Sequence, residues 1–181
     1  LVEQLLALAR QEGRGAGSES WTAVDLAQLA ESAVADAQLL ADRAGIGLRW
    51  QPSEGAVQTR GDVGALTILL RNLIENALRY TPAGGQVRVT AGVQNSTESG
   101  GAGRAWLAVE DSGTGIPPEE RQRVLDRFYR APNATAQSGI PGSGLGLAIV
   151  RAVVARHNGQ LILDDSPSLG GLRVMVHLSR C

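Results

Sequence analysis

VGALTILLRNLIENALRY, residues 63–80, is the segment of this chain that is most informative about its fold. Its apolar residues recur at helical spacing and predict one continuous buried stripe, which consists of Leu66, Leu69, Leu70, Leu73 and Ala77. Asp62 is a suitable N-cap for this helix, and Thr81-Pro82 predicts its end, because the residue before a proline disfavours helical geometry. An apolar stripe of this width needs a partner surface, and we expect it to pack against a β-sheet.

Segments on both sides of this helix predict the rest of the fold. Apolar runs, several of them alternating, predict strands at residues 22–24, 46–50, 57–60, 87–93, 105–110, 160–164 and 173–178. Further helices are expected at residues 25–44 and 144–157, with a short one at 118–125. Polar, glycine-rich segments predict a loop at 95–103 and a mobile loop at 130–143. This order predicts an α+β fold, in which helices cover one face of a mixed sheet.

The first twenty residues are predicted to lie outside this unit. Residues 1–10, LVEQLLALAR, have a helical apolar pattern but are too few to form a stable helix in water by themselves. We therefore expect them to be the end of a longer helix that packs elsewhere. Residues 11–20 are rich in Gly and Ser and are predicted to be a linker, which leaves residues 21–181 as the main domain.

The composition excludes several classes of function. The 17 basic residues are all arginines, so mechanisms that need a lysine are excluded, among them the P-loop and Schiff-base chemistry. Two histidines and one cysteine are too few for a zinc cluster or a disulfide framework. A formal net charge of −1, with scattered charges, argues against nucleic acid as a partner. We also find no apolar run long enough for a membrane span and no recognisable signal peptide.

Two asparagines on the helix at residues 63–80 are candidates for a ligand site. Asn72 and Asn76 lie one turn apart on a face beside the apolar stripe, with Arg79 and Tyr80 close by. Because asparagine is a poor helix former, the pair favours a functional role, in which the amide oxygens bind Mg²⁺ and Arg79 contacts phosphates. For this helix alone, two solvated polar side chains are an equally good interpretation.

Two glycine-rich segments and one aromatic residue are further candidates, although each is a weak signal by itself. DSGTGIP, residues 111–117, would place a carboxylate and a tight backbone against a flat ligand, but Asp-Ser-Gly is also common in turns. GSGLGL, residues 142–147, would bind an anion at a helix start or simply be a flexible helix entry. Its spacing does not fit the dinucleotide motif. Phe128 is expected to be a packing anchor, a ligand contact or both.

These segments become specific when they are taken together and in order. NLIENALRYTP, DSGTGIP, DRFYR and GSGLGLAIV resemble the N, G1, F and G2 boxes of bacterial sensor histidine kinases, with QseC-type sensors as one subgroup considered. The resemblance covers residues 21–180 and implies an ATP-binding domain of the GHKL type, with ATP and Mg²⁺ as cofactors. It implies the Bergerat-type α+β fold, a two-layer sandwich of a mixed sheet with three helices on one face. Residues 1–10 then resemble the end of the dimerisation and phosphoacceptor helix.

The resemblance also implies roles for individual residues. Catalytic roles around the phosphates are implied for Asn72, Arg79 and Arg130, and metal ligation for Asn76 with Asn72. Asp111 corresponds to the carboxylate that binds the adenine amino group, and residues 130–143 correspond to the ATP lid. The residues implied to bind the nucleotide are Asn76, Tyr80, Asp111, Gly113, Gly115, Ile116, Phe128, Gly142, Gly144, Leu145, Gly146 and Leu147.

The chain departs from the family pattern in two places. Leu125 stands where the F box usually begins with phenylalanine, which is expected to weaken lid docking without abolishing it. Neither His157 nor His177 is followed by the acidic residue of a phosphoacceptor box, so both are expected to be structural. His157 ends a predicted helix, where a cation would favour the helix dipole. The phosphoacceptor histidine is therefore expected upstream of Leu1.

The resemblance implies transfer of the ATP γ-phosphate to a histidine on a dimerisation domain, for relay to a response regulator. ATP-hydrolysing relatives have a glutamate where Asn72 stands, and an amide cannot accept a proton, which disfavours a motor ATPase. The expected partners are the protein's own dimerisation domain, as a homodimer, and a response regulator, with no membrane contact by this segment. The expected location is the cytoplasmic side of an inner-membrane sensor. A non-catalytic nucleotide-binding scaffold is the alternative.

Overall fold

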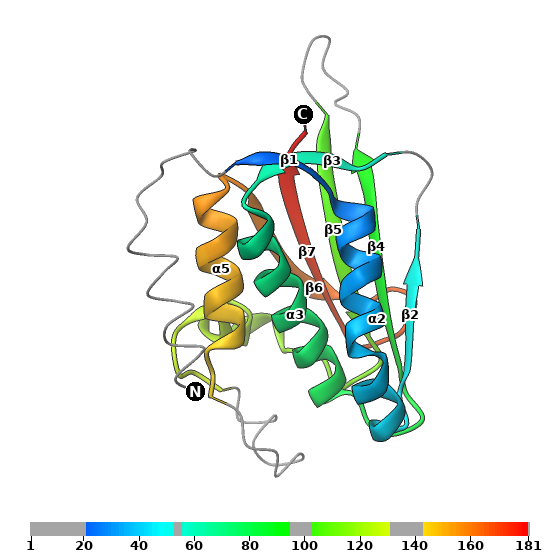
Figure 1. Ribbon diagram of the computed structural model, residues 1–181. Helices are drawn as coiled ribbons and strands as arrows, with labels where there is room; N and C mark the ends of the chain where they lie inside the picture. The colour runs from blue at the N-terminus through cyan, green and yellow to red at the C-terminus, as the bar shows by residue number, and fades with distance from the viewer. Residues whose placement is uncertain (1–20, 53–55, 95–102, 131–142, 181) are drawn as a thin grey trace.

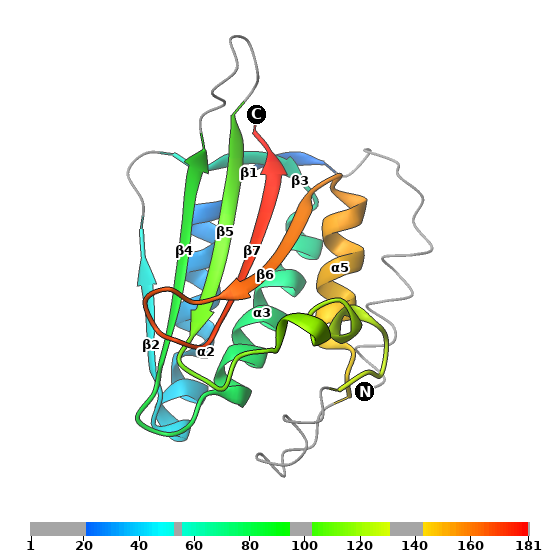
Figure 2. The ribbon, with the colours of Figure 1, turned by 180° about the vertical axis from the view of Figure 1, so that it is seen from behind.

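The computed structural model describes residues 21–52, 56–94, 103–130 and 143–180 of the 181-residue chain. The predictions for residues 1–20, for the loop at 95–102 and for Gly142 with most of the predicted lid lie outside these residues. The described part has two layers, a five-stranded sheet and three helices that all cover one of its faces (Figures 1 and 2). The predicted α+β sandwich is confirmed.

The main sheet is mixed, as predicted. Its strands lie in the order β2-β4-β5-β7-β6, in which β2 and β4 are parallel and all other neighbours are antiparallel. Their bounds are Gly47–Gln51 for β2, Gln86–Gln94 for β4, Arg104–Asp111 for β5, Gln160–Asp165 for β6 and Leu172–Ser179 for β7. Two predicted strands lie elsewhere: β1 (Thr22–Asp25) and β3 (Gln58–Gly61) form a separate antiparallel ribbon. The Thr59 hydroxyl donates to the Ser179 carbonyl oxygen at 2.7 Å and ties this ribbon to the end of β7.

The three long helices have clear local signals at their ends. Helix α2 (Leu26–Ala44) begins after Asp25, whose carboxylate accepts from two N–H groups of the first turn, and ends at Gly45 with a left-handed φ of 66°. Helix α3 (Val63–Tyr80) has the predicted bounds. Helix α5 (Gly146–Arg156) begins two residues later than predicted, because Gly144 has a φ of +67°. None of the helices in the described ranges has the length and apolar content of a membrane span.

The predicted short helix at residues 118–125 is wrong. The structure has two single turns of 3₁₀-helix there, η2 (Pro118–Glu120) and η3 (Arg123–Leu125). Val124 is the one residue of these turns that is buried. A segment with one buried side chain has no apolar stripe to offset the cost of helix nucleation, so it stays in short turns held by side-chain contacts.

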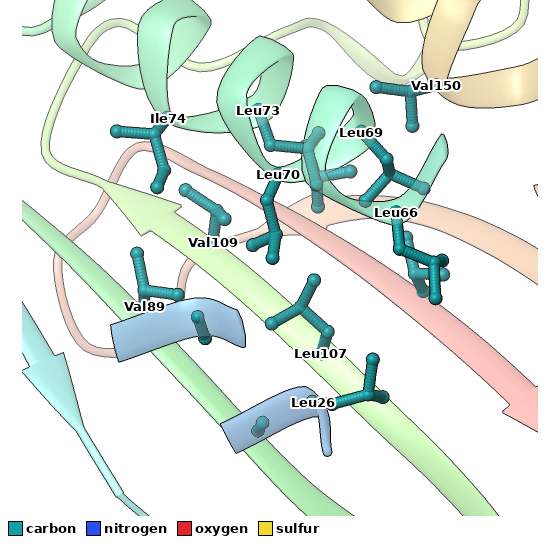
Figure 3. Packing of buried hydrophobic residues seen from close by; sticks show 14 of the residues in the cluster. Leu26, Leu66, Leu69, Leu70, Leu73, Ile74, Val89, Leu107, Val109 and Val150 are labelled. Atoms are coloured by element: carbon teal, nitrogen blue, oxygen red, sulfur yellow. The ribbon is translucent and has the colours of Figure 1, made fainter. Parts of the chain in front are cut away.

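The core lies between α3 and the middle strands of the sheet. Leu66, Leu69, Leu70, Leu73 and Ile74 of α3 are each at most 2% exposed. They pack toward Val89 of β4, toward Leu107 and Val109 of β5, and toward Val150 of α5 (Figure 3). The predicted apolar stripe is therefore confirmed, and α3 is held between the other two helices and the sheet.

A buried histidine joins the end of α5 to the start of α3. The Asp62 N–H donates to His157 Nε2 at 3.0 Å, while His157 Nδ1 lies 2.8 Å from the Val153 carbonyl oxygen. The ring of Trp21 stacks on the imidazole with centroids 5.2 Å apart. Burial lowers the pKa of His157 below its ordinary value. The predicted structural role of His157 is thus supported, but as a neutral hydrogen-bond acceptor and not as a cation at a helix end.

Truncation of Leu70 tests the core. Leu70→Ala should lower the free energy of unfolding by about 2–5 kcal/mol, because a fully buried side chain leaves a cavity. Urea denaturation measures the change. Leu39→Ala is the matched control, since Leu39 is 61% exposed on α2, and it should change stability by less than about 0.5 kcal/mol. Equal effects of the two substitutions would contradict this description of the core.

The His157 contact predicts a pH-dependent stability. Because the folded state lowers the pKa of His157, the unfolded chain binds the proton more readily. The contribution of neutral His157 to the free energy of unfolding is complete above the ordinary histidine pKa of about 6.5 and is lost as the pH falls below that value. Unfolding free energies measured from about pH 7.5 to about pH 5.5 should therefore decrease, and less steeply in His157→Gln. Because the pKa of His177 is also lowered, part of the pH dependence should remain in His157→Gln. A pH dependence that the substitution does not change would rule out the His157 contact as its cause.

Candidate functional site

A pocket opens beside the C-terminal half of α3. It encloses about 900 Å³ of empty space when the solvent at its open mouth is included. Its walls come from α3, from the adjoining ends of β5 and β7, from residues 114–130 and from the start of α5. The apolar part of the lining consists of Leu73, Ala77, Val109, Ile116, Val124, Leu147, Leu172 and Val174. Such a surface suits a flat, largely apolar ring system.

One carboxylate lies in this apolar surrounding. Asp111, at the end of β5, is 5% exposed, and its Oδ1 accepts from the Gly113 N–H at 2.8 Å and from the Leu172 N–H at 3.1 Å. Burial raises the pKa of the Asp111 carboxyl above its ordinary value, while these two hydrogen bonds act in the opposite direction. No donor among the described residues bonds Oδ2, so this oxygen remains able to accept from a ligand.

Glycines surround Asp111 because side chains would not fit there. A Cβ on Gly113 would lie 2.4 Å from the Tyr80 carbonyl oxygen. A Cβ on Gly171, in the turn between β6 and β7, would lie 2.3 Å from Asp111 Oδ1. The sequence indicated the first glycine but not the second, which is distant in the chain. The carboxylate is therefore held from two sides by backbone alone.

The two helix asparagines meet the start of α5. The Asn72 Nδ2 donates to the Ile68 carbonyl oxygen at 2.8 Å, which leaves its Oδ1 as an acceptor. A Cβ on Gly146 would lie 3.0 Å from Asn76 Nδ2 and 3.4 Å from Asn72 Oδ1. Gly146 is thus the small residue that lets α5 approach both amides. Both asparagines and Gly146, which the sequence indicated as separate candidates, therefore lie next to one another.

Positive charge lines the same pocket, and the start of α5 lies at the end near Asn76. Arg79 and Arg130 both line it, and within the described residues Arg79 has no ion-pair or hydrogen-bond partner. Helix α5 has no side-chain cap, so N–H groups of its first turn are not satisfied by a capping side chain. The partial positive charge of a helix N-terminus adds to that of the arginines. This end of the pocket is therefore suited to an anion.

The wall formed by residues 116–130 is held by side-chain contacts. The Tyr129 hydroxyl donates to Glu120 Oε2, and the Arg123 guanidinium lies 4.4 Å from the centre of the Tyr129 ring. Arg121 donates to the Ile116 carbonyl oxygen at 3.1 Å and pairs with Asp165 at 2.5 Å. These contacts fix the wall to the edge of the sheet without a large apolar core.

Ten of the predicted site residues line this one pocket: Asn76, Arg79, Tyr80, Asp111, Gly115, Ile116, Arg130, Gly144, Gly146 and Leu147. Four do not. Asn72 lies next to the lining residue Gly146, and Gly113 next to Tyr80 and Asp111, without lining the pocket themselves. Leu145 is fully buried in the core. Phe128 is 61% exposed with a φ of 63°, so the packing anchor expected from the sequence is not formed by its ring. Its backbone N–H instead donates to the Gly144 carbonyl oxygen at 3.0 Å.

Several lining residues were not predicted from the sequence. Leu73 and Ala77 belong to the apolar stripe that the sequence predicted. Leu73 lies about one helical turn before Asn76 and Ala77 directly after it, so this spacing could have indicated both as lining residues. Tyr129 lies next to Phe128 in the same motif. Leu172 and Val174 carry no local signal, because only the pairing of β7 with β5 brings them to the pocket.

Comparisons with known proteins agree with this geometry. Residues 61–180 match the family model of histidine kinase-, DNA gyrase B- and HSP90-like ATPases. The sensor protein kinase PmrB of Pseudomonas aeruginosa is 39% identical over 180 residues, which cover 99% of this chain and 35% of PmrB. The chain thus spans about a third of the length of this relative. Its similarity extends across the residues that form the pocket.

Solved structures show the same relationship. The mycobacterial sensor histidine kinase MprB structure has a TM-score of 0.69 at 31% identity, over 88% of this chain and 97% of that one. Full-length ShkA, solved in complex with AMPPNP, has a TM-score of 0.77 at 29% identity, over 99% of this chain and 35% of ShkA. The matches do not single out QseC-type sensors among these proteins. The chain belongs to the family of histidine kinase-, DNA gyrase B- and HSP90-like ATPases and, within it, to the catalytic domains of sensor histidine kinases.

Proposed function

We propose that this domain binds ATP in the pocket beside α3 and donates the γ-phosphate to a histidine on a dimerisation domain, for relay to a response regulator. Residues 21–181 are the catalytic domain in this proposal, residues 11–20 the linker, and residues 1–10 the end of the phosphoacceptor helix. The domain works on the cytoplasmic side of an inner-membrane sensor, where ATP is available. The protein's own dimerisation domain, as a homodimer, and the response regulator are its partners.

The observation that carries the proposal is the Asp111 carboxylate. Its Oδ1 is held by two backbone N–H groups, and its Oδ2 is left to accept in an apolar pocket. The exocyclic amine of adenine is a donor of the right chemistry for Oδ2, and Tyr80 and Ile116 line the same cavity for the purine ring. A base that presents an acceptor at that position would leave the buried carboxylate unpaired, which supports a preference for adenine.

The opposite end of the pocket suits the phosphates. Arg79, Arg130 and the N-terminus of α5 supply positive charge there, and Gly144 and Gly146 allow the backbone to approach closely. Within the described residues, no three His, Cys, Asp or Glu side chains form a metal site. Mg²⁺ fits this chemistry, because it commonly takes one or two protein oxygens together with phosphate oxygens and waters. Asn76, with Asn72 beside it, would hold the ion, which would neutralise phosphate charge when bound.

The side chains in and beside the pocket favour transfer of the phosphate to a protein group over ATP hydrolysis. Among the described residues that line the pocket, Asp111 is the one carboxylate, and its Oδ1 is already used by the backbone. Asn72 is an amide and cannot act as a general base toward water. Positioning and charge neutralisation by the arginines are sufficient for phosphoryl transfer when the acceptor is itself a nucleophilic imidazole.

Substitution of Asp111 tests nucleotide binding. Asp111→Asn should weaken binding of a non-hydrolysable ATP analogue by about 1–3 kcal/mol, about 5- to 150-fold, as measured by calorimetric titration with and without Mg²⁺. If the asparagine Oδ1 keeps the hydrogen bonds from the Gly113 and Leu172 N–H groups, its NH₂ group faces the amino group of adenine. Both groups are donors, so the hydrogen bond to the base is lost.

Asp126→Asn is the control for that titration. It makes the same change of charge at an exposed residue that does not line the pocket, so binding should be unaffected. An Asp111→Asn variant that binds the analogue as tightly as this control does would exclude Asp111 as the adenine contact.

Phosphotransfer is tested on a longer chain that includes the phosphoacceptor histidine. With Mg·ATP it should gain acid-labile phosphate on the dimerisation helix. Asn76→Ala should reduce this labelling at least ~10-fold, since a catalytic charge-stabilising contact is lost. Radiolabel retained at alkaline pH and lost in acid gives the readout. Should the longer chain bind Mg·ATP yet remain unlabelled, the domain is a nucleotide-binding scaffold and the kinase proposal fails.

A further inference from the structure

Both acidic residues at the end of β5 contact the turn that joins β6 to β7. Successive side chains of a strand point to opposite faces of a sheet, so Glu110 points to the face without helices and Asp111 to the pocket. The turn, residues 166–171, crosses the helix-free face over β4 and β5 (Figure 2). Glu110 is only 9% exposed although it points to the helix-free face, because the turn lies over it.

On that outer face, buried polar contacts fix the start of the turn. The Ser166 hydroxyl, in a residue that is 4% exposed, donates to Glu110 Oε1 at 3.1 Å. The same hydroxyl accepts from the Leu169 N–H at 3.1 Å. Arg88 of β4 pairs with Glu110 Oε2 at 3.4 Å and so holds the carboxylate from its other side. These contacts tie Ser166 to β5 through Glu110.

On the pocket side, backbone hydrogen bonds connect Ser166 to Asp111. The Ser166 N–H donates to the Gly171 carbonyl oxygen at 2.8 Å, and the Gly170 N–H donates to the Ser166 carbonyl oxygen at 3.0 Å. The Gly171 N–H then donates to the Asp111 carbonyl oxygen, and the next N–H, that of Leu172, to Asp111 Oδ1. Because the Gly171 backbone lies against Oδ1 and the Leu172 N–H donates to it, we expect a shift of the turn to change the orientation of the carboxylate.

We propose that Arg88, Glu110 and Ser166 are positioning residues for base recognition: through the turn at residues 166–171 they set the orientation of the Asp111 carboxylate that selects the amino group of the base. This inference rests on the proposed function, because it takes Asp111 as the contact of that amino group. The three residues do not line the pocket. They act through the Leu172 and Gly171 N–H groups.

Nucleotide selectivity tests the inference. The probes are a non-hydrolysable ATP analogue and the matching analogue of purine riboside triphosphate, which lacks the 6-amino group. The unmodified chain should bind the first about tenfold more tightly or better, as expected for one hydrogen bond to a charged group. Ser166→Ala should reduce this preference to about twofold or less while the affinity for the second analogue stays within about twofold.

A second serine of the same turn provides the matched control. Ser168 is exposed, and its hydroxyl accepts from Arg88 without touching Ser166 or Asp111. Ser168→Ala should keep the tenfold preference. Glu110→Ala should lose it as Ser166→Ala does, and Glu110→Gln should restore it, because an amide oxygen can still accept from the Ser166 hydroxyl. Thermal unfolding of each variant shows whether it is folded.

The outcomes separate this inference from the proposed function. If Ser166→Ala or Glu110→Ala is folded and keeps the full preference, the positioning role is wrong while adenine recognition by Asp111 stands. A loss of affinity that is equal for the two analogues indicates a merely structural role and also overturns the inference. If the unmodified chain itself does not distinguish the analogues, the assignment of Asp111 to the amino group is wrong, and the inference falls with it.

Discussion

The structure depends on one packing constraint, the burial of one stripe of α3 against β4 and β5. Once Leu69, Leu70 and Leu73 face the sheet, helical geometry leaves Asn72 and Asn76 on the side of α5, where Gly146 meets them. The polar residues of the site are therefore placed by the burial of their apolar neighbours, not by polar contacts of their own. Burial of this kind is worth about 1.5–3 kcal/mol for each large side chain, more than an exposed polar contact contributes.

The end of β5 is the second point on which the site depends. A buried carboxylate in an apolar pocket is costly unless it is hydrogen-bonded, and Asp111 meets this cost with backbone N–H groups from two distant segments, the loop after β5 and the start of β7. These donors are part of the fold, so the cost of ordering the carboxylate is met during folding. A ligand then needs to supply one donor for Oδ2, and little reorganisation accompanies its binding.

The sequence allowed prediction of features whose cause is local. The bounds of α3 follow from its cap, its periodicity and the proline after it, and Asp111 follows from its place at a strand end. Features that depend on pairing between distant segments were missed. Nothing near Gly171 in the chain indicates that it touches Asp111, and nothing in β1 or β3 shows that they pair apart from the main sheet. The exposure of the Phe128 ring was missed as well; its backbone has a φ of 63°, and its N–H donates to the Gly144 carbonyl oxygen.

The two walls of the pocket are held by different forces, and this difference has a consequence for function. On the side of α3 and β5, the wall is the core itself. On the side of residues 116–130, the wall is held by ion pairs such as that of Arg121 with Asp165. The Asp165 side chain is 72% exposed and that of Arg121 is 16% exposed. Ion pairs with a solvent-exposed partner contribute only about 0–1 kcal/mol each, so we expect this wall to open at a lower free energy than the core does. We therefore expect residues 116–130 to move more readily than Asp111 and the asparagines when a ligand binds.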